Sequence, residues 1–318
     1  MDTRKKELLG GSGLVLMGLF LTIIFSGCVE NEVSAAEVDN KVSAAEEINT
    51  SSLLINRAEN RSISVKEDMG SGTYITAKMS LDASETDFEE ALKILNSASS
   101  DYEEERQDIK RYKILAEAGL DRVHSLQSFI IAMEHFDKSF AYMYSEEFDS
   151  SKEEIDKMNE ALNDSAVLLS SAKEKVFMLD LDSVPVEEKS SIVLLRDDLE
   201  TSEIMYAELR ALMSGMYPYM EGFNFFSKGL EYFKAESWGE AADEFGKASE
   251  KFSESQQILE KLKDSEYSEV SVGVIQICGF LAQLKEDLPH LEAGCRYMET
   301  SHYAQADEEF NKVSNHYE

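Results

Sequence analysis

The histidines of this chain have no spacing that would hold a metal ion or activate a nucleophile. They stand at His124, His135, His290, His302 and His316. None belongs to an HExxH motif or to a Cys/His zinc pair. The single ExxH, which ends at His302, lacks the second such motif that a di-iron bundle needs. The sequence has no GxSxG motif and no phosphate-binding loop either. It therefore predicts a protein that is not an enzyme and has no catalytic residue, cofactor or metal.

The one cysteine with a chemical context is Cys28. Arg4, Lys5 and Lys6 precede an apolar run, Leu14 to Phe25, and two small residues then lead to Cys28. This order is typical of a secretory signal peptide. The run has about a dozen residues, whereas a membrane span needs about 20. We therefore expect residues 1–27 to be a signal peptide that is removed. An uncleaved signal anchor with an incidental cysteine is the alternative.

The five residues that end at Cys28, Ile24-Phe25-Ser26-Gly27-Cys28, resemble a lipobox. This is the motif at which prolipoproteins are lipidated on the cysteine and cut just before it. The resemblance implies a lipid on Cys28 and a location at the cell membrane, on its extracytoplasmic face.

The charge of the chain excludes nucleic acid as a partner. Residues 1–27 hold two of the 63 acidic and three of the 31 basic residues, so the mature chain keeps 61 acidic and 28 basic residues, a net charge of −33. Binding to phosphates needs clustered Lys and Arg, and no basic stripe follows residue 6. We interpret the acidic pairs as solvated helix faces that keep the protein soluble.

Residues 28–71 predict a flexible acidic tether. They are rich in Ser, Ala, Glu and Asn, and this composition is typical of disorder. Asn49 and Asn60 in this stretch, and Asn163 farther along, match the N-x-Ser/Thr pattern of glycosylation.

Apolar residues recur at steps of three, four and seven from residue 72 to residue 318, which predicts an all-α domain.

Within this domain one spaced pattern of small and aromatic residues recurs. The template is Gly229, Tyr232, Phe233, Trp238, Ala241, Phe245 and Ala248. One copy lies 65 residues later, at Gly294, Tyr297, Met298, Tyr303, Ala306, Phe310 and Val313. Another lies 90 residues earlier, at Ser139, Tyr142, Met143, Phe148, Ser151, Ile155 and Met158. A partial copy keeps Phe88, Ala91, Leu95 and Ala98. Small residues at these positions let two helices of a hairpin approach, and aromatic residues fill the space around them.

The pattern resembles the tetratricopeptide repeat (TPR), whose unit is a helical hairpin. The resemblance implies an irregular array of αα-hairpins, a TPR-like superhelix. Because the copies lie 65 and 90 residues apart and a regular repeat has 34, we expect extra helices between the hairpins. We assign these to 101–123, 186–214 and 265–286.

In regular tetratricopeptide arrays the first helices line a groove that binds peptides. Carried over by register, the groove positions include Phe136, Phe140, Tyr144, Phe223, Phe226, Leu230 and Phe233. These residues are apolar. Either the extra helices cover them as core, or they form an exposed binding surface.

Cys278 and Cys295 are candidates for a disulfide. A hairpin that turned near Asp287 would place them at the same height, eight residues on either side of the turn. Two buried thiols are the alternative.

These features predict a membrane-anchored extracytoplasmic module for protein–protein interaction, attached through its N-terminal lipid to the membrane and binding an unidentified protein. A helical lipoprotein that holds a small molecule or metal between its helices is the alternative. A hydrolase that uses glutamates has no distinguishing motif.

Overall fold

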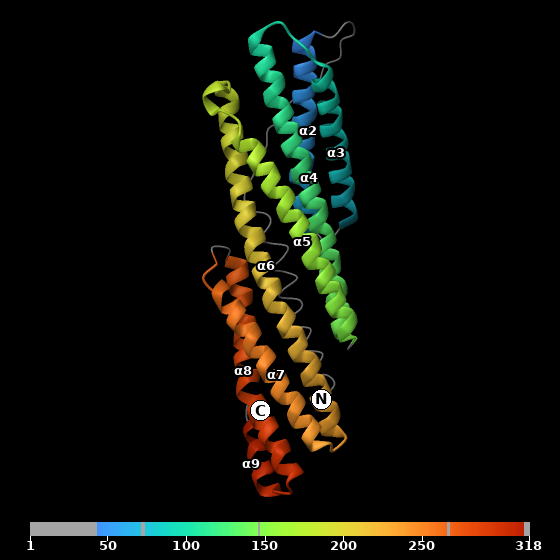
Figure 1. The fold of residues 1–318 in the computed structure, drawn as a ribbon, viewed down its shortest axis with the longest axis vertical. Helices are drawn as coiled ribbons and strands as arrows, with labels where there is room; N and C mark the ends of the chain where they lie inside the picture. Colours follow the sequence, from blue (N-terminus) through green and yellow to red (C-terminus); the bar gives the residue numbers. More distant parts are fainter. Residues whose placement is uncertain (1–42, 71–73, 146, 266–267, 315–318) are drawn as a thin grey trace. The chain divides into compact units, whose positions relative to one another are not determined.

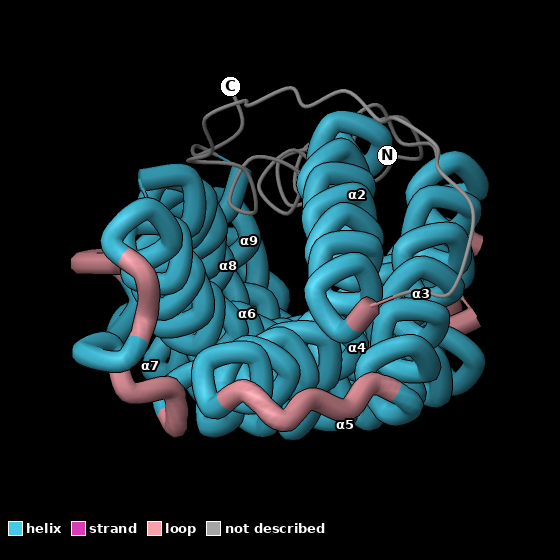
Figure 2. Tube along the Cα trace, turned by 90° about the horizontal axis from the view of Figure 1, so that it is seen from above, coloured by secondary structure: helices cyan, strands magenta, loops and turns pink. Residues whose placement is uncertain are grey.

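The computed structural model of the chain describes residues 43–70, 74–145, 147–265 and 268–314. Cys28 and residues 1–27 lie outside the described residues. Within the described part every regular element is a helix, and no strand occurs (Figures 1 and 2). The α-helices are α2 (Ala44–Gly70), α3 (Tyr74–Ser97), α4 (Glu103–Tyr144), α5 (Phe148–Phe177), α6 (Val186–Lys234), α7 (Trp238–Leu259), α8 (Ser268–Glu299) and α9 (Tyr303–Ser314). Two short 3-10 helices cover Leu181–Ser183 and Glu260–Leu262. The prediction of an all-α fold is confirmed.

The described residues divide into two compact units. The first unit comprises residues 43–134 and 160–206, and the second comprises 135–159 and 207–314. The division falls inside α4, α5 and α6, so each of these three helices contributes to both units.

The extra helices expected between the hairpins are not separate elements. Residues 101–123 belong almost entirely to α4, residues 186–214 begin α6, and residues 265–286 supply the first half of α8. The extra residues therefore lengthen the first helix of each hairpin, and α6 reaches 49 residues. The physical reason is that the helical periodicity has no interruption at the expected joints. Pro218 and Pro289 lie inside α6 and α8 without ending them.

The flexible tether expected over 28–71 is wrong for residues 44–70, which form α2. This helix lies against α3 along its length (Figure 1). Its inner stripe recurs every three or four residues and is buried: Ser51, Leu54, Ile55, Ala58, Ser62 and Val65. Half of these residues are Ser or Ala, so the stripe adds little to the apolar composition. Ser and Ala can nonetheless be buried where two helices pack closely. Because they do not raise the apolar content of the segment, its composition alone suggested disorder.

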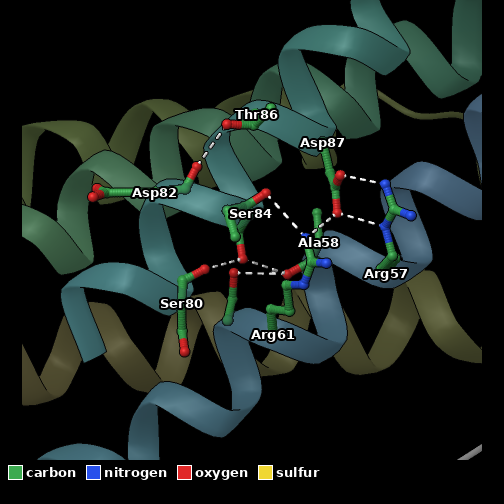
Figure 3. A network of polar contacts seen from close by, with 10 residues as sticks. Arg57, Ala58, Arg61, Ser80, Asp82, Ser84, Thr86 and Asp87 are labelled. Carbon is green, nitrogen blue, oxygen red and sulfur yellow. Dashed lines mark hydrogen bonds and ion pairs between the residues drawn. The ribbon is translucent and has the colours of Figure 1, made fainter. Parts of the chain in front are cut away.

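A buried carboxylate fastens α2 to α3. Asp87 on α3 is 4% exposed and accepts two hydrogen bonds from Arg57, at 2.7 and 2.5 Å, and one from Arg61 at 2.5 Å (Figure 3). Beside it the Ser84 hydroxyl donates to the carbonyl of Ala58 at 3.0 Å. Charged and neutral hydrogen bonds thus join the same two helices.

Three hairpin turns share the same backbone hydrogen bond. The N–H groups of Glu147, Ser237 and His302 donate to the carbonyls of Tyr142, Tyr232 and Tyr297, each five residues earlier. This six-to-one bond is the mark of a Schellman turn, which requires a left-handed residue after the helix. Glu236 and Ser301 supply it, with φ of 58° and 63°. The three tyrosines are equivalent positions of the predicted repeat, so its copies share one kind of turn.

Serine hydroxyls join the paired helices far from these turns. Ser51 donates to the carbonyl of Ala91, Ser125 to that of Ser165, and Ser255 to that of Gly215, and each pair is 40 residues apart. The first of these bonds joins α2 to α3. The α2–α3 pair is therefore a hairpin built like α4–α5 and α6–α7.

This equivalence corrects the register of the partial copy. The buried residues of α3 include Ala77, Leu81, Ser84, Phe88, Ala91 and Leu95. The buried residues of α7 include Ala241, Phe245, Ala248, Phe252, Ser255 and Leu259, each 164 positions later. The sequence pattern had aligned Phe88 with Trp238, a shift of 150. The error arose because the first helix of this hairpin was taken for a tether.

Candidate interaction surface

The phenylalanines among the predicted groove positions are packed against other aromatic rings. Phe136, Phe140 and Phe223 are buried. The rings of Phe136 and Phe140 meet with centroids 4.7 Å apart, and Phe223 stacks on Phe280 of α8 at 6.1 Å.

The remaining groove positions of α6 are partly covered. Phe226 contacts Phe245 with ring centroids 5.9 Å apart, while Phe233 lies 5.2 Å from Trp238 and 5.4 Å from Phe310. Leu230 is partly buried, and the side chain of Tyr144 lies outside the described part. Phe136, Phe140 and Phe223 therefore lie in the core, whereas Phe226, Leu230 and Phe233 are only partly covered.

The predicted disulfide between Cys278 and Cys295 is wrong. Both residues lie on the single helix α8, which runs through Asp287 and Pro289 without turning, and both are buried free thiols. Seventeen residues of helix separate them by about 26 Å, whereas a disulfide needs Cα atoms within about 7 Å. Cys278 and Cys295 are instead two buried thiols, as the alternative prediction had it.

We expect neither thiol to be alkylated in the folded protein. Burial raises the pKa of Cys278 and raises that of Cys295 to about 12, so neither forms the reactive thiolate near neutral pH. Intact-mass analysis after alkylation without a reductant should show no addition on these two residues under native conditions and two in denaturant. An addition to the native chain at either residue would contradict their burial.

A His–Glu–Lys cluster recurs in two hairpins of the second unit. Nδ1 of His135 donates to Glu154 at 2.7 Å, and Lys157 donates to the other oxygen of this carboxylate at 2.9 Å. In the last hairpin His290 and Lys312 hold Glu309 in the same way, at 2.6 and 2.7 Å. Each histidine reaches from a first helix to a glutamate 19 residues later on the second. The histidines thus join helices, which their spacing in the sequence did not reveal.

The middle hairpin has the same glutamate and lysine but no histidine. Lys247 donates to Oε1 of Glu244 at 2.5 Å, and Phe225 occupies the histidine position. The Lys247 ammonium also lies 5.6 Å from the centroid of the Phe225 ring. Oε2 of Glu244 is buried and accepts no hydrogen bond. The cluster is therefore a recurrent helix contact that one copy makes incompletely.

We expect the two complete clusters to make the fold sensitive to acid. The hydrogen bond from His135 lowers the pKa of Glu154, and those from Lys312 and His290 lower the pKa of Glu309. A carboxylate with a lowered pKa stabilises the fold above its ordinary pKa of about 4.3, and this stabilisation is lost as the pH falls through the folded-state value. The double variant Glu154→Gln, Glu309→Gln should be less stable at pH 7 and should lose less stability between about pH 5 and pH 3.

Denaturant titrations across this range measure the effect. Glu160→Gln, at an exposed position on α5, is the control. If the double variant loses as much stability in acid as the parent does, these clusters are not the acid-sensitive groups.

Polar groups also meet inside the first unit, around Arg122. Its guanidinium contacts Asp198 at 2.5 Å and Glu59 at 3.6 Å. Nearby, the hydroxyls of Ser125 and Ser165 lie 3.0 Å apart. Convergent polar groups are what the ligand-binding alternative requires, but these residues bind one another across α2, α4, α5 and α6. No set of three or more His, Cys, Asp or Glu residues in the described part could hold a metal ion.

Large apolar side chains are exposed where α5 ends and α6 begins. Five of them lie within 18 residues, and we call them the apolar tip: Phe177, Met178, Val186, Val193 and Leu194. Met178 is 72% exposed and Val186 is 81% exposed. Such concentrations of exposed apolar surface mark interaction sites. Sequence reasoning missed the tip because its residues fit the helical periodicity, and exposure depends on which helices lie nearby.

Arg196 gives the apolar tip a fixed shape. From α6 it donates to the carbonyls of Val176 and Leu179 at 3.1 and 2.6 Å, and so caps the end of α5. Its guanidinium also lies over the ring of Phe177, 4.8 Å from the centroid. Cationic groups favour the C-terminal end of a helix, where carbonyls lack partners. Arg196 therefore holds the end of α5, with Phe177, against α6.

Asn49, Asn60 and Asn163 are all exposed, the first two on α2 and the third on α5. Their glycosylation stays a prediction.

None of the helices in the described part combines the length and the hydropathy that a membrane span needs. Comparison of the chain with family models, curated proteins and solved structures finds no match.

Proposed function

We propose that this chain is a non-enzymatic interaction module, held on the outer face of the cell membrane by lipid on Cys28. Its TPR-like hairpins act as a scaffold that presents the apolar tip to a protein partner. The observation that carries this proposal is the exposure of the apolar tip on a strongly acidic chain. Leaving large apolar groups in water is unfavourable, so a site that displays several of them where α5 ends and α6 begins suits a binding partner.

The resemblance to TPR proteins is supported by the matching backbone hydrogen bond of three hairpin turns and by the small residues between paired helices. A Cβ placed on Gly229 would lie 2.7 Å from the ring of Phe245, so this position requires glycine. Many functions occur on helical repeats, and the resemblance therefore supports a scaffold without naming its partner.

The docking surface can be tested by crosslinking in native membranes. A photoreactive p-benzoylphenylalanine replaces Met178 in one variant and Val167 in another. Val167 is a matched control because it lies on α5 in the same unit and is 70% exposed. We expect one discrete protein adduct from position 178 and none from position 167. The adduct should disappear when Val186→Asp is added and persist with Val167→Asp. Equal adducts from both positions would contradict the proposed surface.

The anchor is tested by Cys28→Ser. We expect this variant to leave the membrane fraction, because two acyl chains give stable attachment, at about 0.8 kcal/mol per buried CH₂. Cell fractionation and intact mass measure the outcome. If the variant stays in the membrane at full precursor length, the apolar run Leu14–Phe25 is the anchor instead.

A further inference from the structure

The apolar tip continues along α6 as an exposed stripe. Val186 and Val193 of the tip are followed on this helix by Ile204, which is 50% exposed, and Asp197 is exposed between them. Val186, Val193, Asp197 and Ile204 are separated by steps of seven, four and seven residues, so they share one side of the helix. We call these four residues the α6 stripe. From its first residue to its last it spans about 27 Å, or about five helical turns.

The chain around the α6 stripe is more acidic than the rest. Residues 180–204 contain eight acidic and two basic residues, a ratio of four to one, whereas the whole chain has 63 acidic and 31 basic residues, a ratio of about two to one. Asp180 and Asp182 are exposed between the end of α5 and the start of α6, and Asp197 is exposed within the stripe. We call these three residues the tip carboxylates. Negative charge therefore accompanies the exposed apolar side chains.

The cations nearest in sequence to the tip carboxylates are engaged elsewhere. Arg196 donates to carbonyls at the end of α5. Lys173 and Lys175 form ion pairs with carboxylates of α6 and α4. Lys189 is partly buried, and among the residues that the structure describes it forms no ion pair with a tip carboxylate. The negative charge beside the apolar surface is therefore left uncompensated by this chain.

We propose that the partner of the apolar tip is a basic amphipathic helix of another protein, which lies along the α6 stripe. The partner named here rests on the proposed function, since it binds the same surface. An amphipathic helix presents apolar residues on one side, at helical spacing, and covers an apolar surface with them. Lysine or arginine beside these residues would meet the tip carboxylates, which have no cation of their own. An acidic partner or an anionic lipid would be repelled.

The geometry of the surface favours a helix over an extended segment. Extended segments bind by adding a strand to the edge of a sheet, and no strand occurs in the described part of the chain. The α6 stripe follows one side of a single helix, and the side chains of a second helix can pack between those of such a row. A partner helix of about 18 residues would match the stripe's length of about 27 Å.

Crosslinking of the full chain in native membranes tests the chemistry of the partner. p-Benzoylphenylalanine replaces Val186 in one variant and Ile204 in another, and mass spectrometry of the digested adducts locates the captured residues. We expect both positions to capture one protein, at residues about 18 apart in a single segment. This segment should have apolar residues at helical spacing with Lys or Arg beside them. Capture of two unrelated segments, of an acidic or uncharged segment, or of lipid would overturn the proposal.

The tip carboxylates are tested by the triple variant Asp180→Asn, Asp182→Asn, Asp197→Asn. It should lower the yield of the adduct from position 204 by about tenfold, because several exposed charge pairs at the rim of the interface are lost together. Asparagine keeps the side-chain oxygen with which Asp180 accepts a hydrogen bond from the N–H of Asp182, so the connection between α5 and α6 is preserved.

A second triple variant, Glu89→Gln, Asp101→Asn, Glu104→Gln, is the matched control. It changes the net charge by the same amount, at exposed positions of the same unit, and should keep the yield of the adduct. Thermal unfolding of both triple variants should match that of the parent. Equal yields from the two triple variants would overturn the proposal, because the tip carboxylates would then have no special part in binding.

Salt provides an independent measure. Raising the salt concentration from 0.1 M to 1 M shortens the Debye length from about 10 Å to about 3 Å, so the parent's adduct yield should fall and that of the tip variant should change less. A parent yield that does not fall contradicts a basic partner. If the adduct from Met178 persists unchanged in the tip variant, the apolar tip still docks a protein but not through these charges. If Met178 gives no adduct, the proposed function fails as well.

Discussion

Replacing Gly222 by alanine is expected to lower the free energy of unfolding by about 1–3 kcal/mol, whereas the same replacement at Gly279 should raise it by up to about 1 kcal/mol. Both glycines lie inside helices of the second unit. A Cβ on Gly222 would stand 2.6 Å from the ring of Phe252, which is fully buried, so the ring or the helix would have to shift. At Gly279 the new methyl group would meet nothing, so only the gain in helix propensity remains.

Denaturant unfolding of the two single variants measures this difference. The pair controls for the loss of glycine itself, since both changes are Gly→Ala within an α-helix. Equal stabilities would mean that α6 and α7 do not approach each other as closely as described, and the hairpin geometry would have to be abandoned.

Removing the carboxylate of Asp87 is the second change with a large expected effect. Asp87→Ala should destabilise the α2–α3 hairpin by about 1–3 kcal/mol, because the hydrogen bonds that Arg57 and Arg61 donate to this charged acceptor are lost. The effect should stay below the 3–5 kcal/mol of a fully buried ion pair. The reason is that the side chains of Arg57 and Arg61 are 53% and 39% exposed and can be solvated by water.

Limited proteolysis with trypsin measures this effect, since trypsin cleaves after arginine in segments of the chain that are not helical. We expect Asp87→Ala to speed cleavage after Arg57 and Arg61, while cleavage elsewhere in the chain stays as in the parent. Glu89→Ala, at an exposed acidic position on the same helix, is the matched control. If the two variants are cleaved at the same rate, Asp87 does not fasten α2.

The sequence predicted the parts of the fold that depend on residue type. The all-helical class followed from the periodicity of the apolar residues. The sequence also suggested a small residue at 229 and at 294, where the structure brings a phenylalanine ring against the backbone. These positions could be predicted because a close contact between helices limits which residue types fit there.

Other parts depended on tertiary contacts that no local pattern reports. The helix α2 was missed because Ser51, Ala58 and Ser62 can be buried only when α3 lies against them. The disulfide between Cys278 and Cys295 was proposed from a turn near Asp287. The helix α8 continues through this position and through Pro289, since a proline on an exposed side does not have to end a helix. The apolar tip is defined by exposure, which depends on where neighbouring helices are absent.

The serine bonds between paired helices bear on how quickly the chain can fold. Because each bond closes a loop of 40 residues, the hairpins of α2 to α7 are made of contacts that are short in sequence. Chains dominated by such local contacts have low contact order and fold quickly, since little entropy is lost in closing each loop. A hairpin of this kind can close as soon as its second helix has emerged. The order in which the chain is released from a ribosome or a membrane pore is therefore also an order in which it can fold.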